Sequence, residues 1–439
     1  MAGRSWFSGI WRLAVLTLGL WALALAAAVP WAAAQQFQPA SGSPLDLGVF
    51  NVFQQTRDAL FSGLANNIGT LPNPTGGGFT YTFDPSLGVF TRSSESFGPV
   101  FANRAETTGR GKFTLNTSFS RHTFDTVDGL ELRSNSQVFP VLLVPGTLGG
   151  QSVLLVDVIQ LREEVSADVY TLGGIYGITD RIDVGITIPF LDVKVKERPR
   201  ELGFFFCTRD FSQCTNSQPT GQDFRSNSAS ASGLGDIVLR GKWNFLQVPQ
   251  LWGGRMGMAF ALDVKLPTGD EGDRDAFTNQ NRFSQGVNVS LADITGQQFG
   301  LGDPPLGTGV VRVRPQVVVS GSWAGFAPHV NAGAELGTTE GITNDLVYEV
   351  GFDYTFFQRV TVSADLLGRH AFDVDRLRVR NIFDQDFGRK ANADTLTFSI
   401  GVKANPIGTL LVFANLLFPI NEVGIRDRLT PTFGVEWSF

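Results

Sequence analysis

The chain ends on Thr432-Phe433-Gly434-Val435-Glu436-Trp437-Ser438-Phe439, and this stretch indicates the fold class most directly. Phe433, Val435, Trp437 and Phe439 fall on one face of an extended chain, whereas the other face carries Glu436 among small and polar residues. Alternation with a period of two predicts a strand with one apolar and one polar side. An aromatic residue at the end of the apolar side is typical of the closing strand of an outer-membrane barrel. We predict that these four residues form the signal that the barrel-assembly machinery binds.

The same alternation recurs upstream, for example over Ile182–Phe190 and Leu346–Tyr354. Transmembrane barrel strands alternate lipid-facing apolar and lumen-facing polar residues in segments of about ten. Such segments occur at 111–124, 160–178, 182–196, 235–246, 255–266, 309–321, 326–337, 345–356, 360–371, 394–404, 409–419 and 428–439. We predict an all-β chain that forms a transmembrane antiparallel β-barrel of 12 strands. A barrel of 14 strands is the alternative, if Val138–Val144 or Val287–Leu291 also pairs.

The connections between these segments support a barrel. Every second connection is short, namely 179–181, 247–254, 322–325, 357–359 and 405–408. The alternate connections run 125–159, 197–234, 267–308, 338–344, 372–393 and 420–427. Bacterial barrels have short periplasmic turns and longer extracellular loops. The order therefore predicts that both ends of the chain lie in the periplasm.

The first residues indicate export. Arg4 and Arg12 flank the start of an uncharged apolar run from Leu13 to Val29, and Ala32-Ala33-Ala34 offers a cleavage site. A spanning helix is the alternative, although about 17 apolar residues are close to its lower limit. We predict a signal peptide over residues 1–34 and a location in the Gram-negative outer membrane. No later stretch is long and apolar enough for a spanning helix, so a mature chain in a membrane must cross it as a closed barrel.

Composition agrees with a barrel and excludes one class of partner. The chain has 50 Gly, 37 Phe and 17% charged residues, which suits many short strands and turns. Its formal net charge is −6, whereas a nucleic-acid-binding protein has an excess of basic residues.

Cys207 and Cys214 are the two cysteines. In an exported protein such a pair most often forms a disulfide, and the short loop it closes is stabilised by roughly 2–3 kcal/mol. A metal site is the less favoured alternative, because no His lies near the pair.

Residues 35–110 do not follow the barrel pattern that covers 111–439. An apolar stripe at helical spacing predicts an amphipathic helix, and it comprises Leu45, Val49, Val52, Phe53, Leu60, Leu64 and Ile68. Pro and Gly residues then break the chain, and an irregular stretch carries Phe79, Phe83, Phe90, Phe97 and Phe101. This segment is either a plug in the lumen, or a periplasmic tether or disordered linker.

Three motifs carry a resemblance to a known family. They are Gly233-Leu234-Gly235-Asp236-Ile237-Val238-Leu239-Arg240-Gly241-Lys242-Trp243, Lys265-Leu266-Pro267-Thr268-Gly269-Asp270 and Leu306-Gly307-Thr308-Gly309. With them the chain resembles the outer-membrane family named for the meta-pathway of phenol degradation, best over 165–320. The resemblance implies a transporter distantly similar to long-chain fatty-acid uptake channels. The chain departs from the family in the insert Glu271–Pro305, and its N-terminal segment matches no motif of the fatty-acid channels' hatch.

Catalytic motifs are missing from the sequence. His122, His329 and His370 belong to no Gly-x-Ser-x-Gly turn, His-Glu-x-x-His helix or phosphate loop. We predict no enzyme activity, no catalytic, cofactor or metal site, and histidines that face the lumen or the rim. One loop gathers acidic residues that could bind Ca²⁺ or the divalent ions that bridge lipopolysaccharide, namely Asp270, Glu271, Asp273 and Asp275. Their spacing does not match an EF-hand, and a solvated acidic loop is the favoured interpretation.

The predicted lumen faces carry many charges of both signs. They are Arg240, Lys242, Asp263, Lys265, Arg312, Arg314, Glu335, Glu349, Asp353, Asp365, Lys403 and Glu436. In a 12-strand barrel such charges either line an aqueous pore or pair with one another and fill the interior. The wall offers little apolar surface, so the phenylalanines of 35–110 are the predicted apolar surface near the path.

These observations lead to three hypotheses of function. The first is a passive outer-membrane channel for small, partly hydrophobic organic compounds, without a cofactor. The second is a structural or adhesion barrel that acts through loops 197–234 and 267–308, without transport. The third is an outer-membrane lipase, for which a Ser within reach of a His on the outer wall would be needed. The expected partners are outer-membrane lipid and lipopolysaccharide, the assembly machinery and small organic solutes, but no nucleic acid.

Overall fold

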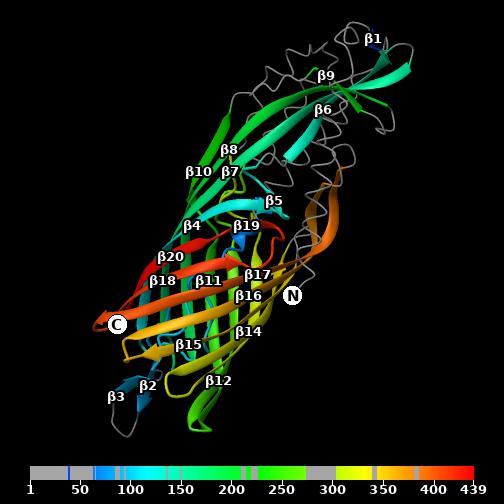
Figure 1. Ribbon diagram of the computed structural model, residues 1–439. Helices are drawn as coiled ribbons and strands as arrows, with labels where there is room; N and C mark the ends of the chain where they lie inside the picture. Colours follow the sequence, from blue (N-terminus) through cyan, green and yellow to red (C-terminus); the bar gives the residue numbers. More distant parts are fainter. Residues whose placement is uncertain are drawn as a thin grey trace.

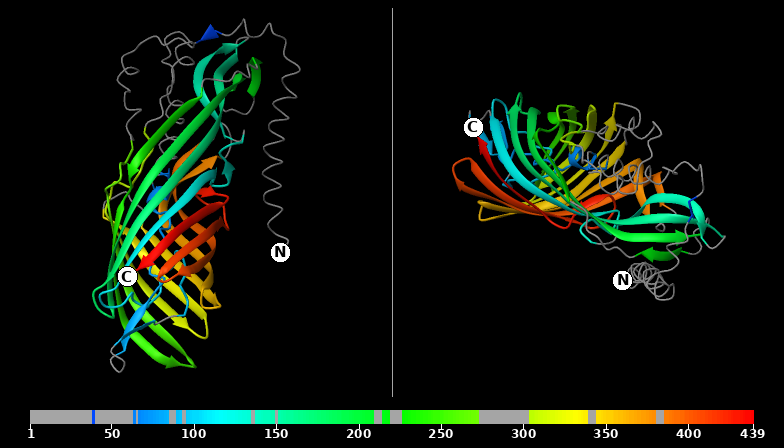
Figure 2. Two further views of the ribbon diagram at one scale, coloured as in Figure 1. Left: turned by 90° about the vertical axis from the view of Figure 1, so that its left-hand side faces the viewer. Right: turned by 90° about the horizontal axis from the view of Figure 1, so that it is seen from above.

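The computed structural model is an antiparallel β-barrel with a tall extension on one side (Figures 1 and 2). It describes residues 38–39, 63–64, 66–84, 89–92, 95–134, 137–148, 151–208, 214–218, 226–272, 303–338, 344–379 and 385–439. In these ranges, no helix has the length and apolar character needed to cross a membrane.

Twelve strands form a closed ring in chain order. They are β4 (Phe113–Val127), β7 (Gln151–Gly177), β8 (Ile182–Cys207), β11 (Ile237–Leu251), β12 (Gly254–Leu266), β13 (Arg312–Ser322), β14 (Phe326–Gly337), β15 (Asp345–Phe356), β16 (Val360–Val379), β17 (Gln385–Ile407), β18 (Leu410–Pro419) and β20 (Thr430–Ser438). Each pairs antiparallel with the next, and the last strand closes on the first with Trp437 opposite Leu115. The predicted 12-strand antiparallel barrel is confirmed.

Other strands lie outside this ring. They are β1 (Gln38–Pro39), the hairpin of β2 (Tyr81–Asp84) and β3 (Val89–Arg92), β5 (Leu130–Glu131), β6 (Gln137–Leu148), β9 (Cys214–Gln218), β10 (Asn227–Leu234) and β19 (Ile425–Asp427). Val138–Val144 falls in β6, which pairs with the upper part of β7 and adds no strand to the ring. Val287–Leu291 lies outside the described residues.

Several predicted loops are in large part strands. β7 begins at Gln151 and β8 runs to Cys207, so these two strands rise together far beyond the rest of the wall (Figure 1). β16 and β17 likewise extend into the predicted loop 372–393. The alternation expected of membrane-spanning strands could not predict these extensions, because the extensions follow a different pattern of polar and apolar residues.

The outer face of the ring is apolar. On β8, Ile182, Val184, Ile186 and Phe190 point outward and are 38%, 40%, 41% and 45% exposed. Similar residues cover the outside of the other strands, including Phe433, Val435 and Trp437 of the predicted assembly signal on β20 and Phe439 directly after it. So much contiguous apolar surface is unfavourable in water and favourable in lipid. The fold is that of a transmembrane β-barrel of the outer-membrane type.

On one side of the barrel this pattern reverses above Phe190. Leu191, Val193 and Val195 of β8 are buried inside, and the charged residues between them face outward. The same reversal occurs on β7, where Val165 and Val169 are buried. Inside, these residues form the largest apolar core together with Leu64, Ile68, Phe124, Val127, Leu132, Ala167, Leu306 and Ile425. The wall at this height is therefore apolar on the inside, contrary to the prediction of a wall with little apolar surface.

Candidate functional site

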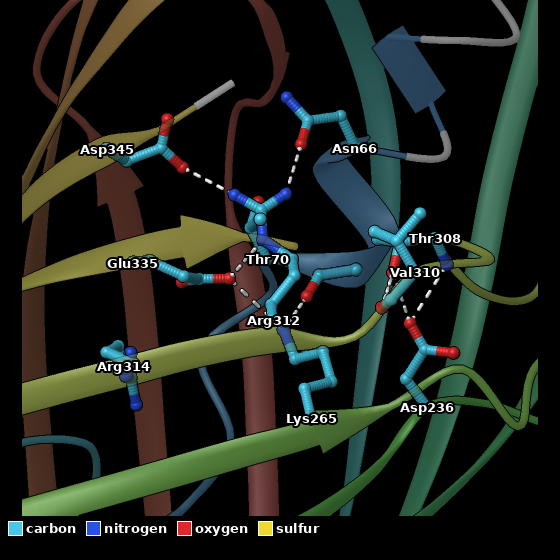
Figure 3. A network of polar contacts seen from close by, with 12 residues as sticks. Asn66, Thr70, Asp236, Lys265, Thr308, Val310, Arg312, Arg314, Glu335 and Asp345 are labelled. Atoms are coloured by element: carbon cyan, nitrogen blue, oxygen red, sulfur yellow. Dashed lines mark hydrogen bonds and ion pairs between the residues drawn. The ribbon is translucent and has the colours of Figure 1, made fainter. Parts of the chain in front are cut away.

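The candidate site is the lumen, where charged residues from neighbouring strands form ion-pair networks. The upper network is centred on Arg312 of β13, which is 2.8 Å from Glu335 of β14 and 2.9 Å from Asp345 of β15 (Figure 3). Arg369 of β16 contacts the same two carboxylates at 2.5 and 3.0 Å. Lys265 lies 3.6 Å from Glu335. Because Arg312, Glu335 and Asp345 are almost fully buried, each charge depends on the others for compensation.

A second network of charged residues lies deeper in the barrel, two positions further along the strands. Asp263 of β12 accepts hydrogen bonds from Arg240 at 2.6 and 2.8 Å and from Arg314 at 2.8 Å. The three residues stand opposite one another in the register of β11, β12 and β13. The side chain of Arg314 keeps 28% of its surface exposed. Glu349 accepts a 2.6 Å hydrogen bond from Asn331.

Further pairs occupy the rest of the lumen. His329 lies between Asp365 at 2.8 Å and Asp353 at 3.5 Å. Lys403 donates to Glu436 at 2.7 Å. Lys242 lies 3.4 Å from Asp183, which was not among the predicted lumen residues. All twelve predicted lumen residues thus face the interior. Eleven of them lie within 3.6 Å of an opposite charge or a histidine, and Glu349 bonds to Asn331.

Sequence reasoning missed three members of these networks, namely Asp183, Asp345 and Arg369. Asp183 and Asp345 lie at the polar positions of strands that were recognised. Arg369 shares a face of β16 with Asp365, four positions away. Continuing the period of two along each strand would have found all three.

The N-terminal segment crosses the lumen and bonds to its wall. Its backbone N–H groups donate to wall side chains: Gly78 to Glu436 at 2.8 Å, Ala105 to Ser320 at 2.9 Å and Thr108 to Asp183 at 2.9 Å. These partners belong to β20, β13 and β8, which lie around the ring. An irregular buried backbone needs such partners, since it cannot satisfy itself as a helix or sheet does. The polar wall therefore serves the segment as a hydrogen-bonding surface.

Three of the five phenylalanines singled out in this segment are buried, and they pack against Leu411, Phe413 and Leu417 of β18. Phe79, Phe97 and Phe101 are 6%, 1% and 4% exposed, and the first two pack edge to face with ring centroids 5.3 Å apart. Phe83 and Phe90 were expected beside them but lie opposite each other in the β2–β3 hairpin. That hairpin projects below the ring at the short-turn end (Figure 1). The reason is local, because residues 81–84 pair with residues 89–92 as a small sheet.

The predicted amphipathic helix is described only at its end. Residues 63–64 and 66–69 are helical, and Leu64 and Ile68 pack into the apolar core between β4, β7 and β8. The other stripe residues, Leu45, Val49, Val52, Phe53 and Leu60, lie outside the described residues, as does the predicted signal peptide.

Polar contacts fix the helix end to the upper network. Arg312 donates to Asn66 at 3.0 Å (Figure 3). Lys265 donates to the Gly69 carbonyl, and Asn67 donates to the Ile425 carbonyl at 2.7 Å.

A cavity of about 280 Å³ lies between this helix end and the wall. Asn66, Thr70 and Pro72 line one side, and apolar residues such as Val347 and Leu417 line the other together with the exposed part of Arg314. A second cavity, of about 30 Å³, lies deeper, among residues of the N-terminal segment. The larger cavity has the mixed lining and the approximate size of a small-molecule site.

The motifs of the family resemblance come together at the rim. Asp236 accepts hydrogen bonds from the Gly269 N–H at 3.1 Å, the Thr308 N–H at 2.9 Å and the Thr308 hydroxyl at 2.7 Å. A side chain on Gly269 would meet the Gly307 Cα at 2.8 Å, so the loops pack this closely only with glycine. Thr308 also abuts Gly69 of the helix end. These motifs therefore fix the rim and support the N-terminal helix; none of their contacts resembles a reaction centre.

His122 meets part of the requirement of the lipase hypothesis. Its Nε2 is 3.3 Å from the Ser120 hydroxyl and its Nδ1 is 2.8 Å from Asp427. The pair faces the lumen, however, and lies in the middle of β4, where the backbone N–H groups bond to β7 and β20. The backbone of this part of β4 is thus bonded within the sheet, whereas an acyl-transfer oxyanion needs free backbone donors. His370 is 2.5 Å from Asp394 at the rim.

Two predicted loop features can be placed in part. Cys207 is disulfide-bonded and stands opposite Cys214 in the β8–β9 pair.

In the acidic loop, the Asp270 carboxylate accepts a 3.0 Å hydrogen bond from the Gly272 N–H, and the Asp270 carbonyl accepts from the Leu306 and Gly307 N–H groups. Asp273 and Asp275 lie outside the described residues. Within the described residues, no cluster of three or more His, Cys, Asp or Glu has the geometry of a metal site.

Comparison with known proteins agrees with the resemblance seen in the sequence. The family model described as "Putative MetA-pathway of phenol degradation" matches residues 144–302, which confirms the resemblance. No curated protein matches the chain by sequence.

Many solved structures are similar to this chain, among them the following three. The COG4313 outer membrane channel from Pseudomonas putida F1 is 13% identical, with 78% of this chain and 100% of that chain covered and a TM-score of 0.40. OprB of Pseudomonas putida is 9% identical, with 75% and 94% covered and a TM-score of 0.29. The CymD monoaromatic hydrocarbon channel is 10% identical, with 75% and 89% covered and a TM-score of 0.29. Such low scores say nothing about what passes through this chain.

Proposed function

We propose that this barrel is a passive outer-membrane channel for small, partly hydrophobic organic compounds. The observation that carries the proposal is the cavity between the N-terminal helix end and the wall. Its volume of about 280 Å³ could hold a compound of the size of a substituted phenol. The family model that matches residues 144–302 is also named for phenol degradation.

The lining of the cavity suits a molecule with an apolar body and a polar group. Val347, Leu367 and Leu417 offer apolar contacts, and the exposed part of Arg314 offers hydrogen-bond donors. An Arg has five N–H donors, of which Arg314 uses at least one on Asp263. A compound with a hydroxyl or carboxylate would therefore find both kinds of contact within one cavity.

Passage beyond the cavity requires the N-terminal segment to move. Residues 78, 96–97, 105 and 108 bond to side chains on β8, β11, β13, β15, β16 and β20, so the segment lies across the lumen. Each hydrogen bond contributes only about 1 kcal/mol net, and water can replace it. We therefore propose that the segment rearranges while the wall stays fixed, without cofactor and without covalent chemistry.

The cavity can be blocked without changing the charges. Ala371 and Ala393 are paired in register on β16 and β17, are buried and line the cavity. Ala371→Trp and Ala393→Trp should each lower uptake of radiolabelled hydroxybenzoate into proteoliposomes several-fold, because the indole fills the cavity. The carboxylate of this probe slows its unaided passage through the bilayer. Ala332→Trp on the exposed outer face of β14 is the matched control and should leave uptake unchanged. Equal uptake by all three variants and the parent chain would contradict the proposed path.

The crossed lumen also favours a second candidate, a structural barrel that transports nothing. The N-terminal segment bonds to six strands, and so many contacts favour a segment that stays in the lumen. The same assay distinguishes the two candidates. Hydroxybenzoate uptake no faster than in protein-free vesicles would favour the structural barrel, and saturable uptake would favour the channel.

A further inference from the structure

The outer face of β4, β7, β8 and β10 changes character between two adjacent rows of the sheet. Phe119, Tyr170, Phe190 and Leu234 stand side by side in register and face outward. The last three are 51%, 45% and 49% exposed. Two positions further along each strand, the next row is Arg121, Asp168, Asp192 and Ser232. An aromatic and apolar row is thus followed directly by a polar row.

Above this boundary the outer face is rich in cations. Lys194, Lys196 and Arg198 follow on alternate positions of β8, and Arg121 lies two strands away on β4. These four residues form the basic patch. The side chains of Arg121, Lys194 and Arg198 are 59%, 59% and 50% exposed. Outward-facing serines of β10 stand beside the patch, with Ser228 opposite Lys196 and Ser230 opposite Lys194.

Three acidic residues lie among these cations. Asp168 is 3.7 Å from Arg121, Asp192 is 2.6 Å from Lys194, and Glu164 is 2.9 Å from Arg198. Surface ion pairs of this kind hold their partners weakly. The cations thus remain available to a stronger anion, and the carboxylates can share a divalent ion with it, since such ions prefer oxygen ligands.

The height of the patch is set by the apolar belt below it. On β8 the outward apolar residues run from Ile182, beside the short turn, to Phe190. Eight residues of strand extend about 26 Å, and the tilt of the strand reduces this toward the apolar height of an outer membrane, about 25 Å. Aromatic girdles mark the edges of that height. The basic patch therefore begins where lipid headgroups begin, on the side away from the short periplasmic turns.

On β14 and β15 and just after β18, in contrast, apolar residues continue toward the upper strand ends. Leu336, Leu346 and Ile420 are 43%, 49% and 44% exposed. The cations are also spread too widely for one small ion. Arg121 and Lys194 are two strand spacings apart, about 10 Å, and Lys194 and Arg198 are about 13 Å apart along β8. A ligand that satisfies all of them must be extended and carry more than one negative group.

We propose that the basic patch binds the phosphate groups of lipopolysaccharide in the outer leaflet. The sugar-phosphate headgroup of that lipid lies at the height of the patch and presents phosphates on an extended frame. Arg and Lys form charge-assisted hydrogen bonds with phosphate oxygens. The serines of β10 add hydroxyl donors, and Tyr170 and Phe190 contact the upper ends of the acyl chains.

A charge-matched pair of triple variants tests the proposal. The patch variant carries Arg121→Gln, Lys194→Gln and Arg198→Gln. The control variant carries Arg181→Gln, Arg255→Gln and Arg359→Gln, which removes three exposed cations near the short turns. Binding of fluorescent lipopolysaccharide to each full-length barrel in detergent should fall about tenfold or more in the patch variant, because each surface cation contributes to attraction of anionic lipid. The control should bind as the parent chain does.

Two further ligands identify the source of the phosphate. Lipopolysaccharide stripped of its phosphates should bind the parent chain as weakly as the intact lipid binds the patch variant. Inorganic phosphate at millimolar concentration should not displace the intact lipid; displacement would point to a small-anion site and overturn the proposal. Equal binding of lipopolysaccharide by patch and control variants would overturn it too. If the triple variant does not migrate as a folded barrel, Lys194→Gln alone gives the same comparison, with a smaller loss expected.

Discussion

The apolar face of β7 and β8 points outward in the lower part of these strands and inward in their upper part. Below Phe190, β8 turns Val184 and Ile186 toward lipid and keeps Asp183 inside. Above Phe190, it turns Lys194 outward and buries Val193 against the N-terminal helix. The strand continues without a break in register between these two regions. The medium outside a strand therefore decides which of its faces is apolar.

The two regions are also held together by different forces. The lumen at the level of the membrane is stabilised by buried ion pairs and hydrogen bonds to the N-terminal segment. The upper region is stabilised by an apolar core that includes Leu64 and Ile68. Variants that disturb one kind of contact should therefore affect one region more than the other, although Arg312 also bonds to Asn66 of the helix end.

Loss of the central cation should have the largest effect. Arg312→Met leaves Glu335 and Asp345 with less compensation in a buried site, and breaking such a network costs about 3–5 kcal/mol. We expect the midpoint of urea unfolding of the folded barrel in detergent to fall accordingly. Lys194→Met, which removes an exposed cation, is the control. An unchanged midpoint for Arg312→Met would mean that the ion pairs do not hold the lower region.

Truncation of the helix stripe should have the next largest effect, on the upper region alone. Leu64→Ala removes a side chain that is 1% exposed in the apolar core, at a cost of roughly 2–5 kcal/mol. We expect faster proteolysis of the N-terminal segment and higher single-channel conductance, with the barrel itself still resistant to heat. Leu234→Ala on the outer face is the matched control. If both variants behave like the parent chain, the helix does not depend on this core.

A charge in the apolar belt should cost somewhat less. Ile186→Arg places a cation near the middle of the lipid-facing part of β8, where such changes cost about 2–4 kcal/mol. We expect a lower unfolding midpoint in lipid vesicles. A variant as stable as the parent would show that Ile186 does not face the acyl chains.

The reverse change above the boundary should have the smallest effect. Lys194→Ile replaces an exposed cation by an apolar residue and breaks one surface ion pair, which contributes about 0–1 kcal/mol. The unfolding midpoint should shift little, and by far less than for Ile186→Arg. Shifts of similar size for the two substitutions would contradict the assigned boundary at Phe190.

Much of the fold could be predicted from the sequence because a membrane-spanning strand repeats with a period of two. The 12-strand ring could be predicted from alternating segments such as Phe433 to Phe439 and Ile182 to Phe190, together with the order of short and long connections. The same period placed Arg312, Asp263 and the other lumen residues on the inner face. It could not say which cation meets which carboxylate, because partners come from different strands and depend on register.

Patterns along the chain were thus sufficient for the ring of strands, the lipid-facing and lumen-facing residues and the absence of catalytic motifs. Only the folded barrel shows that Gly78 and Thr108 bond to side chains of the lumen wall and that residues 81–84 pair with residues 89–92 in a hairpin. It also brings the motifs around Asp236, Gly269 and Thr308 into one rim cluster. The cause is the range of the interactions. Alternation is local and is visible along one strand, whereas hydrogen bonds and ion pairs in the lumen join residues that only the closed barrel brings together.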